Sequence, residues 1–213
     1  TSRYQEGNTV KISRSSTAAA VLGTALACVL GAAGAAGAQQ QPAPAPAPAN
    51  AASAAAGSAV QAPAAVVGEL KAATARASLA PGARAVCYAA HVQDVGWQPT
   101  VCNGEVAGTT GQGRRIEAVL ISTGGVGGIC ANAHLADVGW QGWACAGDGT
   151  VVGVGTTGQS RRMEALGLQV GSGSVAAQAH VQDHAWLNAV GGNPVYVGTT
   201  GQSRRMEALR VWV

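Results

Sequence analysis

His91-Val92-Gln93-Asp94-Val95-Gly96-Trp97 is the stretch that decides the fold of this chain, because it returns twice. The two further versions are His134-Leu135-Ala136-Asp137-Val138-Gly139-Trp140 and His180-Val181-Gln182-Asp183-His184-Ala185-Trp186. Each version is followed by the block Gly-Thr-Thr-Gly-Gln-x-Arg-Arg-x-Glu-Ala, which begins at Gly108, Gly155 and Gly198. Because 43 and 46 residues separate the three His, the chain contains three copies of one unit.

The three copies occupy residues 85–121, 129–170 and 175–213. Short apolar runs between turn residues, such as 86–92 and 115–121, predict about four strands per copy, and Asn103-Gly104 predicts a hairpin. A unit of about 40 residues is too small to bury a core alone. We therefore predict an all-β domain in which the copies close around a pseudo-threefold axis, as a β-prism or a β-trefoil, because closure protects sheet edges. An open array of three independent modules is the main alternative.

Composition and charge narrow the class of protein. With 31 Gly and no Phe, the chain suits a small Gly-rich β fold better than a helical enzyme core. The formal charge is +3, but after residue 38 ten basic side chains face nine acidic ones. Nucleic acid binding needs a dense positive surface, so we exclude nucleic acid as a partner.

Residues 1–38 have the pattern of a signal peptide. Lys11 and Arg14 precede a mildly apolar stretch, residues 17–34, and Ala36-Gly37-Ala38 provides the small residues that signal peptidase accepts. The stretch is too weakly apolar for a stable membrane span. We expect cleavage after Ala38, a secreted protein and no membrane span after signal removal, with lipidation at Cys28 as the minor alternative.

Residues 39–80 are predicted to form a low-complexity linker rich in Pro and Ala. Pro at every second position of residues 42–48 favours an extended, semi-rigid spacer. Residues 64–80 are rich in Ala but show no apolar stripe, so we assign them to the same linker. The β domain is then expected to span residues 81–213.

The two repeated blocks resemble the ChW repeat, the clostridial hydrophobic repeat with a Trp. The pattern His-x-x-x-x-Gly-Trp, followed by Gly-Thr-Thr-Gly-Gln-Ser-x-Arg-x-Glu-Ala, covers nearly all of residues 85–213, although copy three has His184-Ala185 in place of the usual apolar-Gly pair. The resemblance implies an exported, surface-associated module of secreted clostridial and actinobacterial proteins, with a role in binding or adhesion. It implies no catalytic residues.

Four Cys follow the predicted signal peptide, two in copy one and two in copy two: Cys87, Cys102, Cys130 and Cys145. Copy three has Ala176 and Gly191 at the matching positions, so both partners are absent together. Of the three possible pairings, only Cys87–Cys102 with Cys130–Cys145 explains this joint loss without an unpaired thiol. Zinc is the rival interpretation, but an exported chain without Cys-x-x-Cys pairs argues against it, and we expect no metal and no cofactor.

Three repeated residue types are expected to be structural. Counting by twos along the last strand of each copy places its Arg and Glu on the apolar face: Arg115 and Glu117, Arg162 and Glu164, Arg205 and Glu207. We expect each Glu to point into the core and to accept hydrogen bonds from neighbouring Arg or from the Gly-Thr-Thr-Gly backbone, because a buried carboxylate needs such partners. The repeated Trp are expected in the core, where they replace the missing Phe, and a sugar-stacking platform beside Asp and Gln is the functional alternative: Trp97, Trp140 and Trp186.

The remaining polar repeat residues are candidates for ligand binding. The repeated His lies on a mixed face of its strand, where a structural hydrogen bond is the alternative, and the Asp follows at a turn. Trp143 has no counterpart in the other copies and, like Trp212, is expected to be exposed. The ligand-binding candidates are His91, Asp94, His134, Asp137, Trp143, His180 and Asp183.

The sequence favours binding over catalysis. No copy holds a unique acid, base or nucleophile, and neither G-x-S-x-G nor H-E-x-x-H occurs. We expect a secreted or cell-surface module that binds an extracellular glycan, a cell-wall polymer or a surface protein through repeated weak sites. A structural envelope protein without a small ligand is the first alternative, and a glycan hydrolase the second.

Overall fold

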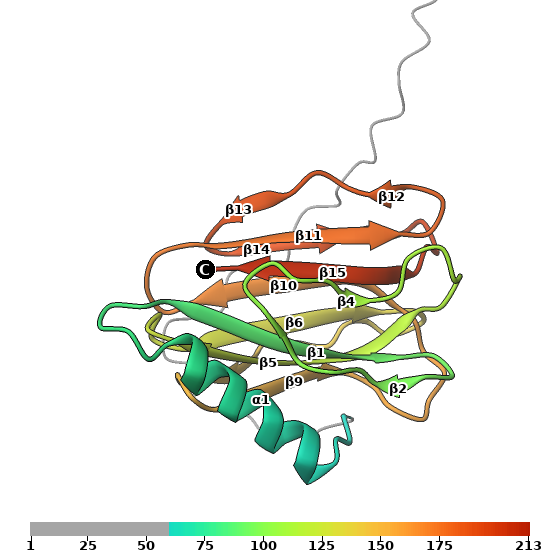
Figure 1. The fold of residues 1–213 in the computed structure, drawn as a ribbon. Helices are drawn as coiled ribbons and strands as arrows, with labels where there is room; N and C mark the ends of the chain where they lie inside the picture. Colours follow the sequence, from blue (N-terminus) through green and yellow to red (C-terminus); the bar gives the residue numbers. More distant parts are fainter. Residues whose placement is uncertain (1–59) are drawn as a thin grey trace, which may run out of the picture. The chain divides into compact units, whose positions relative to one another are not determined.

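A computed structural model describes residues 60–213 of the chain. The predicted signal peptide and the first part of the predicted linker lie outside these residues. Within them the fold is mostly β, with three five-stranded sheets and one short helix, α1 (Ala64–Ala77; Figure 1). No helix in this part of the chain has the length and apolar character needed to cross a membrane.

Each copy forms five strands, one more than predicted, of which the first and last are long. Copy one forms β1 (Ala85–Val92), β2 (Gly96–Trp97), β3 (Val101–Cys102), β4 (Ala107–Gly108) and β5 (Ile116–Gly124). Copy two forms β6 (Ile129–Leu135), β7 (Gly139–Trp140), β8 (Ala144–Ala146), β9 (Val151–Gly155) and β10 (Met163–Val170). Copy three forms β11 (Val175–Val181), β12 (Ala185–Trp186), β13 (Val190–Gly192), β14 (Val195–Gly198) and β15 (Met206–Trp212).

The copies exchange strands in a ring. Each sheet holds four strands of one copy and the fourth strand of another. Thus β9 of copy two pairs with β5, β14 of copy three pairs with β10, and β4 of copy one pairs with β15. No copy is a complete sheet by itself, in keeping with the argument that one unit is too small to fold alone.

The hairpin predicted at Asn103-Gly104 is wrong. The two residues do form a turn with positive φ, 46° and 92°, but the strands on either side of it belong to different sheets. Asn103 is bonded twice to Val86: its N–H donates to the carbonyl (2.9 Å), and its Oδ1 accepts from the Val86 N–H (3.0 Å). The turn therefore holds β3 against β1 while the chain leaves for another sheet, which a local turn signal does not reveal.

The inner faces of the three sheets share one core. Alternate residues of the long strands fill it, among them Tyr88, Ile121, Leu135, Leu168 and Leu209. The expectation that the repeated Trp fill this core is wrong, because all three are half-buried and lie on short strands at the outer face. Aliphatic side chains, Met and Tyr88 provide the missing bulk instead.

The predicted disulfides are confirmed. Cys87 is bonded to Cys102 and Cys130 to Cys145. In both copies the two Cys are register partners, so each bridge ties a short strand, β3 or β8, to the long first strand. Each closes a loop of 15 residues, worth about 3 kcal/mol by loop-closure entropy.

Helix α1 (Ala64–Ala77) occupies residues that the sequence assigned to the linker. It packs against β1, β5 and β9 on the outer face of the copy-one sheet (Figure 1). Its Leu70 is fully buried in a second small cluster with Cys87 and Leu120. Four small side chains of the helix, Val66, Val67, Ala73 and Ala77, pack against the same cluster, so the helix docks through a stripe of small apolar residues around one Leu.

Candidate functional site

The outer face of every sheet carries the same four side chains in mutual contact, which we call the outer cluster. It consists of the repeated Trp, His, Glu and Arg. The members are Trp97, His91, Glu117 and Arg115 in copy one; Trp140, His134, Glu164 and Arg162 in copy two; and Trp186, His180, Glu207 and Arg205 in copy three.

A β-bulge puts the Glu into this cluster. In copy one Val92 pairs with Ile116 and His91 pairs with Ala118, so Glu117 is an extra residue without a partner across the strand pair. The same register shift occurs at Glu164 and Glu207. The Glu are buried, as expected, with exposed fractions of 6%, 4% and 5%. They nevertheless lie on the outer side beside His and not in the core, because the bulge breaks the alternation by twos.

Each Glu carboxylate is shared between Arg and His. In copy one, Glu117 Oε1 accepts from Arg115 Nη2 at 2.7 Å, while Oε2 lies 3.2 Å from Nδ1 of His91. Copies two and three repeat these contacts, with Arg–Glu distances of 2.8 and 2.9 Å and His–Glu distances of 3.2 Å in both. The buried charge is thus balanced by Arg, and the imidazole Nδ1 lies at ion-pair distance from the other carboxylate oxygen.

The His in turn orients the Trp. Their residues are register partners on adjacent strands, and their rings meet edge to face with centroids 5.3, 5.3 and 5.4 Å apart in the three copies. Edge-to-face contact is favourable for aromatic rings at this distance. The chain of contacts Arg–Glu–His–Trp therefore holds one half-buried indole per copy in the same local geometry.

Each cluster lies at a junction between two copies. The Gly-Thr-Thr-Gly block of the neighbouring copy docks on the carbonyl of the Glu, with Thr156 N–H donating to Glu117 O at 2.9 Å. Thr199 and Thr109 make the same bond to Glu164 and Glu207. The Gly before each Thr is required: at Gly155, where φ is +101°, a Cβ would approach Glu117 O to 2.4 Å. The repeated Gly-Thr-Thr-Gly segment therefore joins each copy to its neighbour through a backbone hydrogen bond.

The predicted Asp candidates lie outside the cluster. Asp94, Asp137 and Asp183 sit in exposed turns with φ of 60°, 63° and 62°. Asp94 lies 3.5 Å from Arg114, and Asp183 lies 2.9 Å from Arg204. These Asp close the turn between the His strand and the Trp strand, which is the turn role considered from the sequence.

Trp143 and Trp212 are half-buried and not exposed as predicted. Trp143 contacts Tyr196 with ring centroids 6.0 Å apart, and its Nε1 is buried without a hydrogen-bond partner among residues 60–213. Trp212 lies over Gly104, where its indole fills the space of an absent side chain. Sequence reasoning could not place either ring, because the position of Trp212 depends on a Gly in a distant turn and that of Trp143 on a Tyr of another strand.

The three clusters differ in what lies beside the Trp. Arg210 stacks over Trp186 at 4.6 Å in copy three, and Tyr196 meets Trp140 edge-on at 5.6 Å in copy two. Residues 60–63 cover Trp97 in copy one. The sequence shows why the neighbours of the Trp differ between the copies. One outward position of the last strand is Leu120 in copy one, Gly167 in copy two and Arg210 in copy three. Sequence analysis missed this variation because it followed the constant residues.

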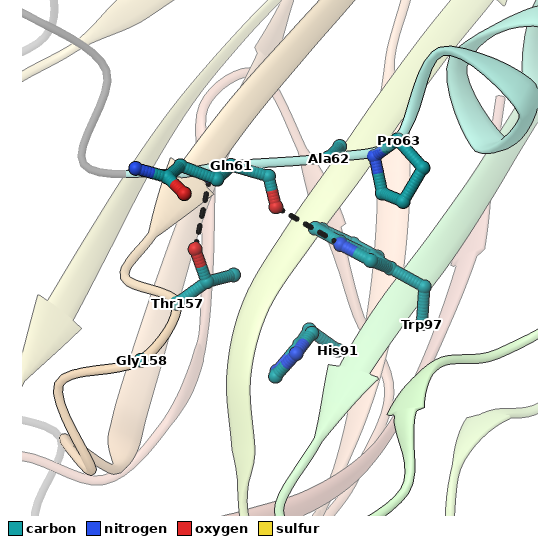
Figure 2. A pocket seen from close by; sticks show the side chains of 7 residues that line it. All are labelled: Gln61, Ala62, Pro63, His91, Trp97, Thr157 and Gly158. Carbon is teal, nitrogen blue, oxygen red and sulfur yellow. Dashed lines mark hydrogen bonds between the residues drawn. The ribbon is translucent and has the colours of Figure 1, made fainter.

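A pocket of about 490 Å³ opens beside the copy-one cluster (Figure 2). Its walls are His91 and Trp97 from copy one, Thr157 and Gly158 from copy two, and residues 61–63. A second pocket of about 470 Å³ is polar and is lined by side chains of all three copies, including the three Arg of the clusters. Among residues 60–213, no group of three or more His, Cys, Asp or Glu is placed to hold a metal ion.

Comparison with known proteins identifies the repeat. The family model described as Clostridial hydrophobic W (ChW) matches residues 91–123, 134–170 and 180–213. No curated protein and no solved structure matches the chain. The three matched segments each begin at the repeated His and include the whole outer cluster of one copy. The chain therefore belongs to the ChW repeat family and carries three tandem ChW repeats.

Proposed function

We propose that this chain is a secreted, non-catalytic binding module that holds an extracellular glycan or cell-wall polymer at repeated weak sites. The observation that carries the proposal is the outer cluster, which holds a half-buried Trp in the same local geometry in every copy and leaves it uncovered by residues 60–63 in copies two and three. A Trp held beside polar groups is a surface on which a sugar ring stacks.

Repetition is the second support for binding. Repeated weak sites on one domain raise the avidity for a polymer with repeating units far above the affinity of one site. Trp140 and Trp186, which residues 60–63 do not cover, provide these sites, and their different neighbours tune each site to another part of the polymer. A surface protein is the alternative partner, and the same clusters would serve it.

The chemistry of the cluster argues against a hydrolase. Glycoside hydrolysis requires two carboxyl groups on either side of the scissile bond. In the cluster, Arg and His already engage both oxygens of the one Glu, and the nearby Asp lies in an exposed turn. A structural envelope protein without a ligand therefore stands ahead of an enzyme as the alternative.

The disulfides support an extracellular location, because such bridges persist in oxidising compartments. The predicted signal peptide agrees with it. The ring of exchanged strands, which joins three separate sheets, favours a β-prism over a β-trefoil.

The full secreted chain tests the proposal on a glycan array and on insoluble cell-wall material. Saturable binding that falls on Trp186→Ala supports it. His184→Ala is the matched control, because His184 lies in the exposed turn of the same copy and outside the cluster. Silence across sugars and wall polymers would leave the structural role as the better explanation.

A further inference from the structure

Residues 60–63, which we call the strap, lie beside Trp97 of the copy-one cluster, and Figure 2 shows Gln61, Ala62 and Pro63 next to Trp97 and His91. The indole Nε1–H of Trp97 donates to the backbone carbonyl of Gln61 at 3.1 Å. The backbone N–H of Gln61 donates to Thr157 Oγ1 at 2.9 Å. One residue of the strap is thus held by both of its backbone groups, once by copy one and once by copy two.

These contacts recognise a backbone and not a particular side chain. The Gln61 backbone makes both bonds, while Ala62 and Pro63 line the pocket beside Trp97. An aromatic side chain that donates to a carbonyl and packs beside Pro is a way of binding extended, Pro-containing peptides, whose backbone loses little entropy on binding. In the copy-one groove Trp97 is the donor, Ala62 packs in the same cluster as Trp97, and Pro63 lies exposed at the edge of the pocket with the extended φ and ψ of −57° and 143°.

The groove is shaped for the strap. Val60 packs with Trp97 and Val151 around the buried Leu120. A Cβ added to Gly153 would approach Val60 Cγ1 to 3.3 Å and Leu120 Cδ2 to 2.9 Å, so Gly at this position makes room for both side chains. In the copy-two sheet the corresponding partner across the strands is Tyr196, whose ring occupies this space.

We propose that the copy-one groove is a binding site for extended peptides containing Ala-Pro, which the intact chain fills with its own strap. The ligand class is present in the chain beyond the strap, since residues 43–48 contain Ala-Pro three times. The strap competes at the effective concentration of a tethered ligand, on the order of millimolar, so an external peptide binds well only when the strap is removed. This inference goes beyond the glycan proposal and does not depend on it.

The probe is the synthetic peptide Ala-Val-Gln-Ala-Pro-Ala, the sequence of residues 59–64. It is titrated into the full chain and into a full-chain variant with the strap changed by Val60→Gly, Gln61→Pro and Pro63→Ser, in which Pro at position 61 removes the N–H that bonds to Thr157. Binding is followed by the NMR signal of the Trp97 indole N–H. We expect the strap variant to bind the peptide at least tenfold more tightly than the unchanged chain, and the indole N–H of the strap variant to exchange faster until peptide is added.

Two controls locate the binding. Adding Thr157→Val to the strap variant removes the acceptor of the peptide N–H and should weaken binding by about fivefold to tenfold, the effect of one hydrogen bond. A peptide N-methylated at its Gln should show the same fivefold to tenfold loss of affinity for the strap variant, because it lacks the N–H that bonds to Thr157. Thr110→Val, the equivalent change in the Gly-Thr-Thr-Gly block of copy one, should have no effect, because this block joins the copy-three sheet.

Absence of saturable binding to the strap variant at millimolar peptide would overturn the proposal. Equal affinity of the strap variant and the unchanged chain would overturn it too, as would equal losses from Thr157→Val and Thr110→Val. Because no sugar is present in these titrations, failure here leaves the glycan proposal intact, and a silent glycan array leaves peptide binding intact.

Discussion

His91 Nδ1 lies 3.2 Å from Glu117 Oε2 because Glu117 is the extra residue of a β-bulge. Without the bulge, the alternation of side chains would turn this Glu toward the apolar core with Val119. The bulge instead brings a buried carboxylate between Arg115 and His91. The equivalent bulges at Glu164 and Glu207 do the same in copies two and three. The Glu is therefore the structural centre of each outer cluster.

Removal of this carboxylate should destabilise the domain. We expect Glu164→Ala to lower the free energy of unfolding by about 2–4 kcal/mol, somewhat less than for a fully buried pair. The expected loss of stability is smaller because the Arg162 side chain is 32% exposed, so that water partly replaces the carboxylate as its partner. Urea unfolding measures the change. Glu69→Ala on the exposed side of α1 is the control and should be neutral, and a similar loss from both changes would contradict the assigned role.

Copy three is built to accept the disulfide that it lacks. Ala176 and Gly191 are register partners, as the Cys are in the other copies, and a Cβ at Gly191 would lie 3.8 Å from the Ala176 Cβ. Natural disulfides have this Cβ separation. The pair Ala176→Cys and Gly191→Cys should therefore form a third bridge and raise stability by about 3 kcal/mol, as expected for a loop of roughly 15 residues.

Thiol titration and non-reducing peptide mapping reveal whether this bridge forms. The single change Ala176→Cys is the control and should leave one free thiol and nearly unchanged stability. Two free thiols in the double variant, or mixed pairing with Cys130, would show that the copy-three strands do not hold this register.

Tyr88 links copy one to copy three across the core. Its buried hydroxyl donates to the carbonyl of Glu105 and accepts from the Val211 N–H at 3.0 Å. Desolvation by burial raises the pKa of Tyr88 to about 12. An unfolded Tyr ionises near pH 10, so the stability linked to this group is fully present below about pH 10 and is lost as the pH rises toward 12.

Two measurements test this link. Tyr88→Phe should cost about 1–3 kcal/mol at neutral pH, because the buried Val211 N–H loses its partner. The variant should also lose less stability than the unchanged chain between pH 10 and 12. Equal alkaline sensitivity of the two proteins would mean that another group controls the transition. Tyr88 is the informative target because it contacts both terminal copies.

The sequence predicted those features that follow from comparing the three copies and from the length of the repeat. The joint loss of two Cys in copy three was enough to pair the other four, and the repeat length was enough to require one shared core. The features that depend on a single inserted residue or on distant contacts were missed. Counting by twos does not detect a bulge, and a turn at Asn103-Gly104 does not say which sheet receives the next strand.

The docking site of α1 can be recognised in the sequence by comparing the outer-face residues of the three copies. Ala89 and Leu120 lie on the outer face of copy one, where copy two has Asn132 and Gly167 and copy three has Gln178 and Arg210. An apolar pair at positions that are not apolar in the other copies indicates a covered surface. The covering segment itself, rich in Ala, carried too weak a pattern to be recognised.

Trp140 and Trp143 offer the most direct test of where the ligand binds. Both are half-buried in copy two and both contact Tyr196, but only Trp140 is held by the His of the outer cluster. If the repeated cluster is the site, Trp140→Ala should weaken retention on cell-wall material by about 1–3 kcal/mol, the usual cost of losing an aromatic anchor. Trp143→Ala should leave retention nearly unchanged.

Circular dichroism melting of both variants separates loss of binding from loss of folding. The reverse order of effects, with Trp143 carrying the retention and Trp140 only the stability, would move the site from the repeated cluster to the Tyr196 side of copy two. Equal retention of both variants and the unchanged chain would show that copy two does not bind the wall.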